Sequence, residues 1–186
     1  MPKKAASVEI QNVVASATLK QKLDLISIVE VLPGVEYKPE QFPGLVYRLK
    51  KPKTATLIFS SGKMVCTGAR SERQAKRAVM RVIDELKSNG IVILGSPEIK
   101  IQNIVASADL NGKIDLESSA QSLERTMYEP EQFPGLIYRM VDPKVVLLLF
   151  ASGKLVCTGA QTEGEVQRAI EKLQETLEAK GLISYE

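Results

Sequence analysis

The four phenylalanines of the chain form two matching pairs, in settings that favour an outward-pointing ring. Phe42 and Phe133 each precede a Pro-Gly turn, and Phe59 and Phe150 each follow 17 residues later. Proline biases the preceding residue toward extended backbone, which holds its ring outward. A phenylalanine at a loop tip usually folds back beneath its loop, but two equivalent aromatic pairs are the pattern expected of apolar wedges.

Basic side chains recur at the same spacing around both pairs. They are Arg48, Lys53 and Lys63, and then Arg139, Lys144 and Lys154. In most proteins such cations are solvated surface. Around an apolar face they also suit contacts to phosphate groups, so both interpretations stay open on the residues alone.

The composition argues against most catalytic chemistry. The chain has no histidine and only two cysteines, Cys66 and Cys157. Nucleophile systems that depend on histidine and zinc sites with histidine ligands are therefore excluded. Glycine patterns typical of nucleotide-binding enzymes are absent as well. We predict no catalytic residue, no metal site and no cofactor, and we interpret both cysteines as small buried hydrophobes.

Length and composition are typical of a globular protein in solution. Of the 186 residues, 44% are hydrophobic and 25% are charged, with a net charge of +3. The basic start of the chain is not followed by an apolar segment, and the longest apolar run, 145–151, is too short to cross a membrane. We expect a soluble intracellular protein.

An internal repeat covers nearly the whole chain. Ile10-Gln-Asn-Val-Val-Ala-Ser-Ala recurs 91 positions later as Ile101-Gln-Asn-Ile-Val-Ala-Ser-Ala, and the same offset holds without a gap up to Val92. Two long copies imply a pseudo-symmetric molecule, in effect a dimer on one chain. The predicted repeats are 1–92, with a short extension over 1–8, and 93–186.

Each repeat has the same predicted elements. In the first, strands are expected over 10–19, 35–41, 45–50, 54–60 and 63–69, and a helix over 23–32. A capping box at Ser71 starts a long helix with one apolar stripe, which Gly90 ends. The order β-α-β-β-β-β-α predicts an α+β fold in which helices cover one face of an antiparallel sheet.

The other face of this sheet is predicted to be largely apolar. Strand parity places Asn12, Val14, Leu57, Phe59, Val65 and Thr67 there, and in the second repeat Asn103, Val105, Leu148, Phe150, Val156 and Thr158. Val13, Ile58, Met64 and Cys66 are expected to face the helices. An exposed apolar patch of this kind usually binds something, although a further layer could cover it as core.

These repeated strings closely resemble the TATA-box-binding protein family. The resemblance rests on Ile-Gln-Asn, on Phe133-Pro-Gly-Leu-Ile-Tyr-Arg and on Phe59-Ser-Ser-Gly-Lys-Met-Val-Cys-Thr-Gly-Ala, each with its second copy. It implies a saddle with a curved ten-stranded sheet and helices on the convex face. The near absence of an N-terminal extension resembles the archaeal branch, which implies a cytoplasmic, nucleoid-associated protein, or a nuclear one if the source is eukaryotic.

The resemblance also implies a role for each position of the open face. The family is itself a standard example of minor-groove binding with apolar wedges. The implied wedges are Phe42, Phe59, Phe133 and Phe150, and the implied polar contacts are Asn12, Thr67, Asn103 and Thr158. The implied apolar floor is Val14, Leu57, Val65, Val105, Leu148 and Val156. The implied contacts to the DNA backbone are Arg48, Lys53, Ser61, Lys63, Arg139, Lys144, Ser152 and Lys154. The resemblance also implies that relatives carry arginine at the positions of Lys53 and Lys144.

Charge differs between the repeats. Residues 1–92 carry a net charge of +8 and residues 93–186 a net charge of −5. Solvated helix faces explain this as readily as recruitment of different partners at the two ends. The resemblance implies promoter DNA, a transcription factor B homologue and the RNA polymerase initiation complex as partners. We hypothesise that Glu129 and Glu131 help to bind transcription factor B.

Two other functions are consistent with the residues. An architectural DNA-bending protein would bind any duplex equally, and a small-ligand carrier would use the curved sheet as a closed pocket without affinity for DNA. The leading prediction is a transcription initiation factor that binds and kinks TATA-box DNA. Whether the free protein dimerises through its apolar face stays open on the residues alone.

Overall fold

The computed structural model describes residues 5–185, which form two compact units. The first unit comprises residues 12–102, and the second combines residues 5–11 with residues 103–185. The units therefore differ from the sequence repeats in one respect. The first residues of each repeat's opening strand belong to the unit formed by the other repeat.

Besides the first residues of β6, the first unit contains five strands and two helices among its described residues. They are β1 (Ser7–Thr18, from residue 12 onward), α1 (Leu25–Val31), β2 (Glu36–Tyr37), β3 (Leu45–Lys50), β4 (Lys53–Ile58), β5 (Lys63–Ala69) and α2 (Glu72–Ser88). The strands are antiparallel neighbours in the order β2-β3-β4-β5-β1. Strands β2 to β5 are consecutive along the chain and form a meander, whereas β1 joins the sheet beside β5.

The second unit repeats this arrangement. It contains β6 (Glu98–Asp109, from residue 103 onward), β7 (Lys113–Ile114), α3 (Leu116–Ser122), β8 (Thr126–Met127), β9 (Leu136–Met140), β10 (Val145–Leu149), β11 (Lys154–Ala160), α4 (Glu163–Ala179) and β12 (Ile183–Ser184). Its main sheet has the order β6-β11-β10-β9-β8, and β12 pairs with β7 separately. The sequence did not predict this last pair.

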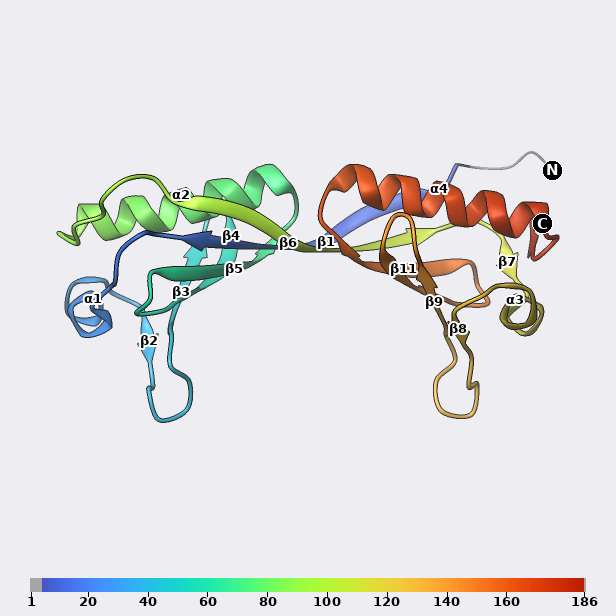
Figure 1. Cartoon of the computed structure of the whole chain (residues 1–186), viewed down its shortest axis with the longest axis horizontal. Helices are drawn as coiled ribbons and strands as arrows, with labels where there is room; N and C mark the ends of the chain where they lie inside the picture. The colour runs from blue at the N-terminus through green and yellow to red at the C-terminus, as the bar shows by residue number, and fades with distance from the viewer. Residues whose placement is uncertain (1–4, 186) are drawn as a thin grey trace. The chain divides into compact units, whose positions relative to one another are not determined.

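The predicted fold class is confirmed. Over residues 5–185, the antiparallel sheet order includes ten strands, β1–β5 and β6 with β8–β11. In Figure 1, α2 (green) runs along one side of the strands of the first unit, and α4 (red) runs along the strands of the second. None of the helices in this part of the chain combines the length and apolar character that a membrane span requires.

The boundaries differ from the predictions where local hydrogen bonds end an element. Strands β3 and β5 match the expected ranges. The strand expected over 35–41 was wrong, because only Glu36–Tyr37 pair with β3 before the chain turns. The N–H groups of Gln41 and Phe42 both donate to the carbonyl of Lys38, at 2.9 Å, and close that turn.

Helix α1 begins two residues after its predicted start, and an aspartate caps the N-terminus of each short helix. The carboxylate of Asp24 accepts the N–H groups of Ile26 and Ser27, and that of Asp115 accepts the N–H of Ser118. Such side chains satisfy the open donors of the first turn. The Ser27 hydroxyl bond lowers the pKa of Asp24 below its usual value, and the backbone N–H of Ser118 lowers the pKa of Asp115.

The core of the first unit lies between the helices and the sheet. The apolar stripe of α2 is fully buried, as the sequence predicts, and consists of Ala75, Ala78, Val79, Val82, Ile83 and Leu86. It packs with Ile28 of α1 and with the helix-facing residues Ile58 and Met64 of the sheet. This burial fixes which side of each strand faces away from the helices.

Candidate nucleic-acid interface

The open face of each unit is built from rows of residues that oppose one another across neighbouring strands. In the first unit, Val46 pairs with Leu57, which pairs with Val65. In the second unit the equivalent row is Ile137, Leu148 and Val156. All six are half-buried, whereas the helix-facing Val13, Ile58, Met64 and Cys66 are fully buried. The parity predicted from the sequence is therefore confirmed.

In each unit, a second row of paired residues joins an arginine that is predicted to contact the DNA backbone to the threonine of the Asn-Thr pair. Arg48 pairs with Ala55, which pairs with Thr67, and Arg139 pairs with Val146, which pairs with Thr158. Val46, Ala55, Ile137 and Val146 of this face were not predicted from the sequence. Applying the alternation of strand residues to 45–50 and its copy would have found them.

The two phenylalanines of each unit contact one another. The ring centroids of Phe42 and Phe59 lie 5.7 Å apart at 63°, and those of Phe133 and Phe150 lie 5.9 Å apart at 67°. These are edge-to-face contacts, which stabilise aromatic pairs. Phe42 is nevertheless 38% exposed and Phe133 42% exposed. Each unit thus presents a supported apolar edge at the loop between its short strand and the next.

The glycine of each Pro-Gly turn makes room for these rings. A Cβ on Gly44 would lie 2.9 Å from the ring of Phe42 and 3.0 Å from that of Phe59. On Gly135 the corresponding distances to Phe133 and Phe150 would be 2.7 and 3.0 Å. Neither glycine has a positive φ angle. These glycines were predicted to serve the turn, but their small size is what the ring pair requires.

An asparagine and a threonine form the same cluster in both units. The Asn12 amide nitrogen donates to Oγ1 of Thr67 at 3.1 Å, and its oxygen accepts the N–H of Gly68 at 2.7 Å. Asn103 makes the same bonds to Thr158 and Gly159, at 3.3 and 2.7 Å. The register between β1 and β5, and that between β6 and β11, shifts beside these clusters. These bonds fix the orientation of each amide, whose nitrogen has a second N–H besides the one that it donates to threonine.

The predicted backbone contacts surround these faces but differ between units. Nη1 of Arg48 lies 2.7 Å from Oε1 of Glu36 in an exposed ion pair that the sequence did not predict. Glu36 lies opposite Val46, two residues from Arg48, which is a reachable diagonal position in an antiparallel pair. The second repeat has Met127 at the position of Glu36. Within residues 5–185, Arg139 makes no ion pair.

The loop residues are arranged alike. The hydroxyl oxygens of Ser61 and Ser152 accept the backbone N–H of Lys63 and Lys154, at 3.4 Å in both cases. Lys53 begins β4, and Lys144 directly precedes β10. The sites assigned from the sequence therefore gather on one side of each unit. Their contacts to DNA remain predictions.

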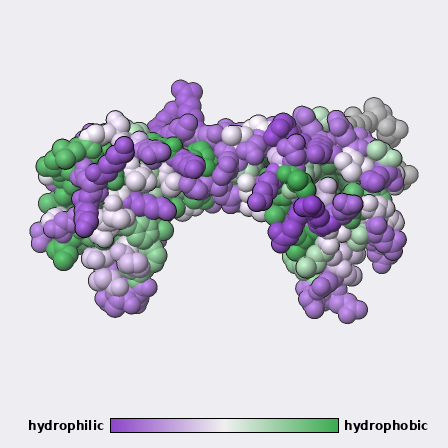
Figure 2. Space-filling view, viewed as in Figure 1, coloured by the Kyte–Doolittle hydropathy of each residue, from purple (hydrophilic) through white to green (hydrophobic). Residues whose placement is uncertain are grey.

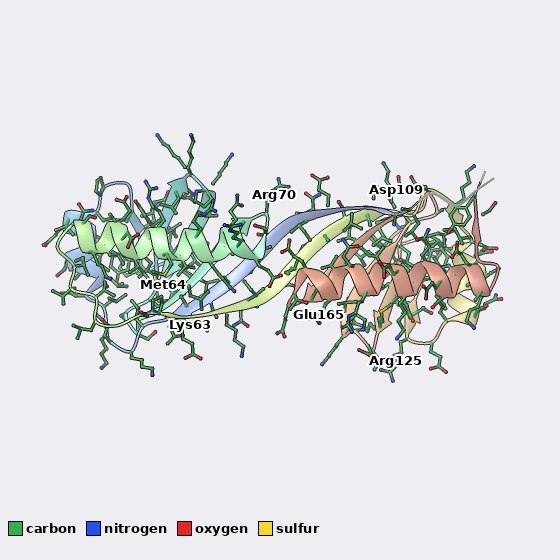
Figure 3. All side chains as sticks on the ribbon, turned by 90° about the horizontal axis from the view of Figure 1, so that it is seen from above. Lys63, Met64, Arg70, Asp109, Arg125 and Glu165 are labelled. Atoms are coloured by element: carbon green, nitrogen blue, oxygen red, sulfur yellow. The ribbon has the colours of Figure 1, made fainter. Side chains whose placement is uncertain are left out.

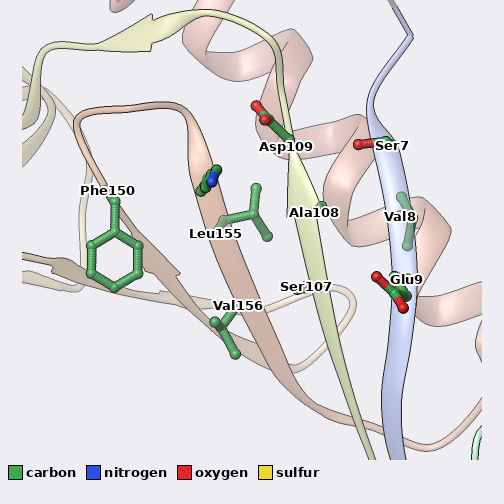
Figure 4. Close-up of a pocket in the computed structure, with 10 residues that line it drawn as sticks. Ser7, Val8, Glu9, Ser107, Ala108, Asp109, Phe150, Leu155 and Val156 are labelled. Atoms are coloured by element: carbon green, nitrogen blue, oxygen red, sulfur yellow. The ribbon is translucent and has the colours of Figure 1, made fainter.

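The start of the chain completes the open face of the second unit. Ser7, Val8 and Glu9 line a groove of about 620 Å³ together with residues of β6 and β11 and with Phe150 (Figure 4). Nε2 of Gln11 donates to Oγ of Ser107 at 2.9 Å and holds the two strands together. Glu9, Ser107 and Asp109 were not predicted to lie on this face, because strand alternation does not reveal which strands are neighbours.

Figure 2 shows where apolar and polar residues reach the surface. Hydrophilic residues (purple) gather over α2 and α4, while apolar patches (green) appear below the helices in both units.

Cys66 and Cys157 are fully buried. Burial raises the pKa of both thiols, that of Cys157 to about 11. This confirms the interpretation of both as buried hydrophobes.

Comparison with known proteins identifies close relatives of the whole chain. The family model described as "Transcription factor TFIID (or TATA-binding protein, TBP)" matches residues 7–89 and again 98–180. The chain is 57% identical over 176 residues to the TATA-box-binding protein of Pyrodictium occultum, covering 95% of this chain and 87% of that protein. It is 50% identical to that of Pyrobaculum calidifontis, covering 100% and 94%.

A solved structure has the same architecture. The chain superposes on the structure named Methanococcus jannaschii TBP with a TM-score of 0.85 and 50% sequence identity. The match covers 93% of this chain and 99% of the other. The two family matches correspond to the two copies found in the sequence.

Proposed function

The chain belongs to the TATA-binding protein family, and from this premise we propose that it initiates transcription by binding and kinking promoter DNA. Membership of this family supports the role of a transcription factor that binds the TATA box. The finer proposal is that the open face of each unit contacts the minor groove of half a TATA box, and that the two phenylalanine pairs insert between base steps. Neither step requires an enzyme activity.

One observation carries this proposal. The open faces of both units present the same set of groups in the same geometry, namely an Asn-Thr cluster, an apolar row and an edge-to-face phenylalanine pair. A ligand bound by both would itself have two similar halves. Duplex DNA has that property at an A·T-rich site, where the minor groove presents equivalent acceptors from both strands.

The chemistry of the face explains a preference for A·T pairs. In the minor groove A·T and T·A present only acceptors, whereas G·C adds the guanine amino group. The second N–H groups of Asn12 and Asn103 are suitable donors to those acceptors. The apolar rows, such as Val46-Leu57-Val65, would leave a guanine amino group without a partner. Selection against G·C therefore follows from desolvation.

The phenylalanines supply the deformation. Inserting an apolar ring unstacks a base step, which costs a few kcal/mol and is cheapest at flexible steps such as TA. The edge-to-face partner of each exposed phenylalanine, Phe59 or Phe150, would hold the exposed ring in place during insertion. Cations beside the apolar rows, including Arg139 and Lys144, would hold the displaced backbone through phosphate contacts.

Recruitment of a transcription factor B homologue, and through it RNA polymerase, is the second part of the proposal. Glu129 and Glu131 are exposed on the loop that carries Phe133, and the carbonyl of Glu129 accepts the N–H of that phenylalanine at 2.9 Å. A partner that reads their charge would sit beside the inserted ring. Reversing both charges should abolish the ternary complex while leaving binary DNA binding intact. An unchanged ternary complex would contradict this assignment.

The test of the DNA-binding proposal is a titration followed by fluorescence anisotropy. A short duplex with a TATA box and a G·C-rich duplex of equal length are compared over a salt series, with bending followed by energy transfer between the duplex ends. We expect at least about tenfold tighter binding to TATA, equivalent to about 1.4 kcal/mol, together with bending. Equal binding to both would support the architectural alternative, and no binding to either would support a ligand carrier or a covered face.

A further inference from the structure

The residue before β8 has an unusual backbone conformation for its type. Arg125 has a φ angle of 58°, and its equivalent in the first repeat is Gly34, with a φ angle of 84°. The fold thus needs a left-handed residue at this position in both units. Glycine meets that need without strain, whereas a long side chain does not. An arginine at a position whose backbone suits glycine better points to a use for its side chain.

Arg125 lies directly beside Arg139, which is a predicted contact to the DNA backbone. Its carbonyl accepts the N–H of Arg139 at 3.0 Å, so the two residues oppose one another where β8 meets β9. Arg125, Arg139 and Lys144 together line a cleft of about 590 Å³ whose remaining walls include Val141 and Val146. Figure 3 shows Arg125 at the edge of the second unit, clear of α4.

The cleft has a concentrated positive charge without a balancing carboxylate. Within residues 5–185, none of its three cations makes an ion pair. The carboxylates nearest in sequence, Glu124 and Asp142, do not line it. Three like charges around one cleft repel one another, and an anion seated among them would relieve that repulsion. A phosphate oxygen is a suitable acceptor for a planar guanidinium group.

The first unit arranges its cations differently. Gly34 has no side chain to contribute, and Arg48 is held by Glu36. A third cation, Lys50, instead occupies the position that Val141 has in the second repeat, next to the turn between β3 and β4. The internal repeat therefore does not predict the site around Arg125.

We propose that Arg125, Arg139 and Lys144 bind one phosphate of the DNA backbone, and that Arg125 is a DNA contact present in the second unit alone. This inference rests on the proposed DNA-binding function. It adds to that function a phosphate site on the outer edge of the second unit, beyond the contacts that the two repeats share.

The variant Arg125→Gly tests the inference with little risk to the fold, because glycine is the residue of the first repeat and suits the backbone there. Arg168→Gln is the matched control, since Arg168 is an exposed cation of the same unit on α4. We expect Arg125→Gly to bind a TATA duplex about three- to tenfold more weakly near 0.1 M salt. The slope of log affinity against log salt should decrease by about 0.9, the value for one lost phosphate contact in B-DNA. Arg168→Gln should change neither quantity.

Duplexes with a single neutral methylphosphonate identify the phosphate. Scanning the backbone should reveal one position where the neutral group weakens the wild-type protein but has no further effect on Arg125→Gly, since both changes remove the same contact. Equal behaviour of Arg125→Gly and Arg168→Gln, or purely additive losses at every phosphate, would overturn the inference while leaving the proposed function in place. Failure of the wild-type protein to bind TATA DNA would overturn both.

Discussion

The central groups of the two open faces are nearly identical, whereas the exposed helix faces have diverged. Across the open faces, the clusters at Asn12 and Asn103 have the same partners, and the bond to the backbone N–H is 2.7 Å in both. Across the exposed sides of α2 and α4, Lys76 is replaced by Gln167 and Met80 by Glu171. The comparison fits the proposed ligand, a duplex with two similar halves, since the groups proposed to contact it are the ones that match between the units.

The loops that carry the exposed phenylalanines show both behaviours at once. Lys38 and Glu129 occupy equivalent positions, and the carbonyl of each accepts the N–H of its phenylalanine at 2.9 Å. The backbone geometry that presents the ring is preserved although the side-chain charge is reversed. The proposed wedge role therefore extends to both rings, and the charge beside each ring distinguishes the two units.

The strongest test of this equivalence replaces each asparagine by aspartate. Asn12→Asp and Asn103→Asp keep the acceptor for the Gly68 or Gly159 N–H, so the fold should persist. Each places a carboxylate against minor-groove acceptors and removes a donor, and an unpaired charge at an interface costs about 2–5 kcal/mol. We expect affinity for TATA DNA to decrease by at least about 30-fold in both, measured by anisotropy.

Gln167→Glu introduces the same charge on the exposed side of α4 and serves as the control. It should bind DNA like the wild-type protein at moderate salt. A loss confined to one asparagine would contradict the claim that both open faces contact equivalent halves of the site.

Removing the exposed rings should have the next largest effect. Phe42→Ala and Phe133→Ala each remove one apolar wedge, so we expect about tenfold weaker binding, about 1.4 kcal/mol, and a smaller bend measured by energy transfer. Met80→Ala provides a control, because Met80 is 40% exposed, similar to Phe42, but lies on α2. Full bending by either phenylalanine variant would refute the wedge assignment.

Adding a methyl group beside each ring pair should produce a smaller, graded effect. A Cβ at Gly135 would approach the ring of Phe133 more closely than a Cβ at Gly44 would approach Phe42, 2.7 against 2.9 Å. Gly135→Ala should therefore disturb its ring pair more than Gly44→Ala, with losses of DNA affinity of a few-fold, about 1 kcal/mol or less. The reverse order would show that the contacts with the rings do not determine the effect.

The rate at which reagents label the buried thiols should not depend on bound DNA. Because burial raises the pKa of Cys157 from 9.0 to about 11, its thiol stays protonated at pH 8, and disulfide reagents should label it about 100-fold more slowly than in the unfolded chain. The raised pKa contributes stability that is present below pH 9 and decreases as the pH rises toward 11. Rapid labelling of the native protein, or protection that depends on DNA, would contradict the buried assignment.

The sequence predicted the fold well where one periodicity dominates. The duplicated strings, the strands 45–50 and 63–69 and the apolar stripe of α2 all follow from alternation or helical spacing. The short strand at Glu36–Tyr37 did not, because the turn that ends it depends on the Lys38 carbonyl. The pairing of β7 with β12 was missed because each strand has only two residues.

Parts of the candidate site could not be predicted because they depend on which strands are neighbours. Glu9 reaches the groove of the second unit only because residues 5–11 join that unit. The ion pair between Glu36 and Arg48 requires the register of β2 against β3, and the need for glycine at 44 requires the position of both rings. Spacing along one chain contains none of this information.

The most direct test of the central claim exchanges the bases of the TATA box without changing its minor groove. Replacing each T·A pair by a C·I pair alters the major groove but leaves the minor groove without an amino group, as in A·T. Binding and bending are then measured for the TATA, C·I and G·C duplexes under one set of conditions. If the open faces bind the minor groove, the C·I duplex should be bound and bent like TATA. Binding of the C·I duplex only as weakly as the G·C duplex would contradict it.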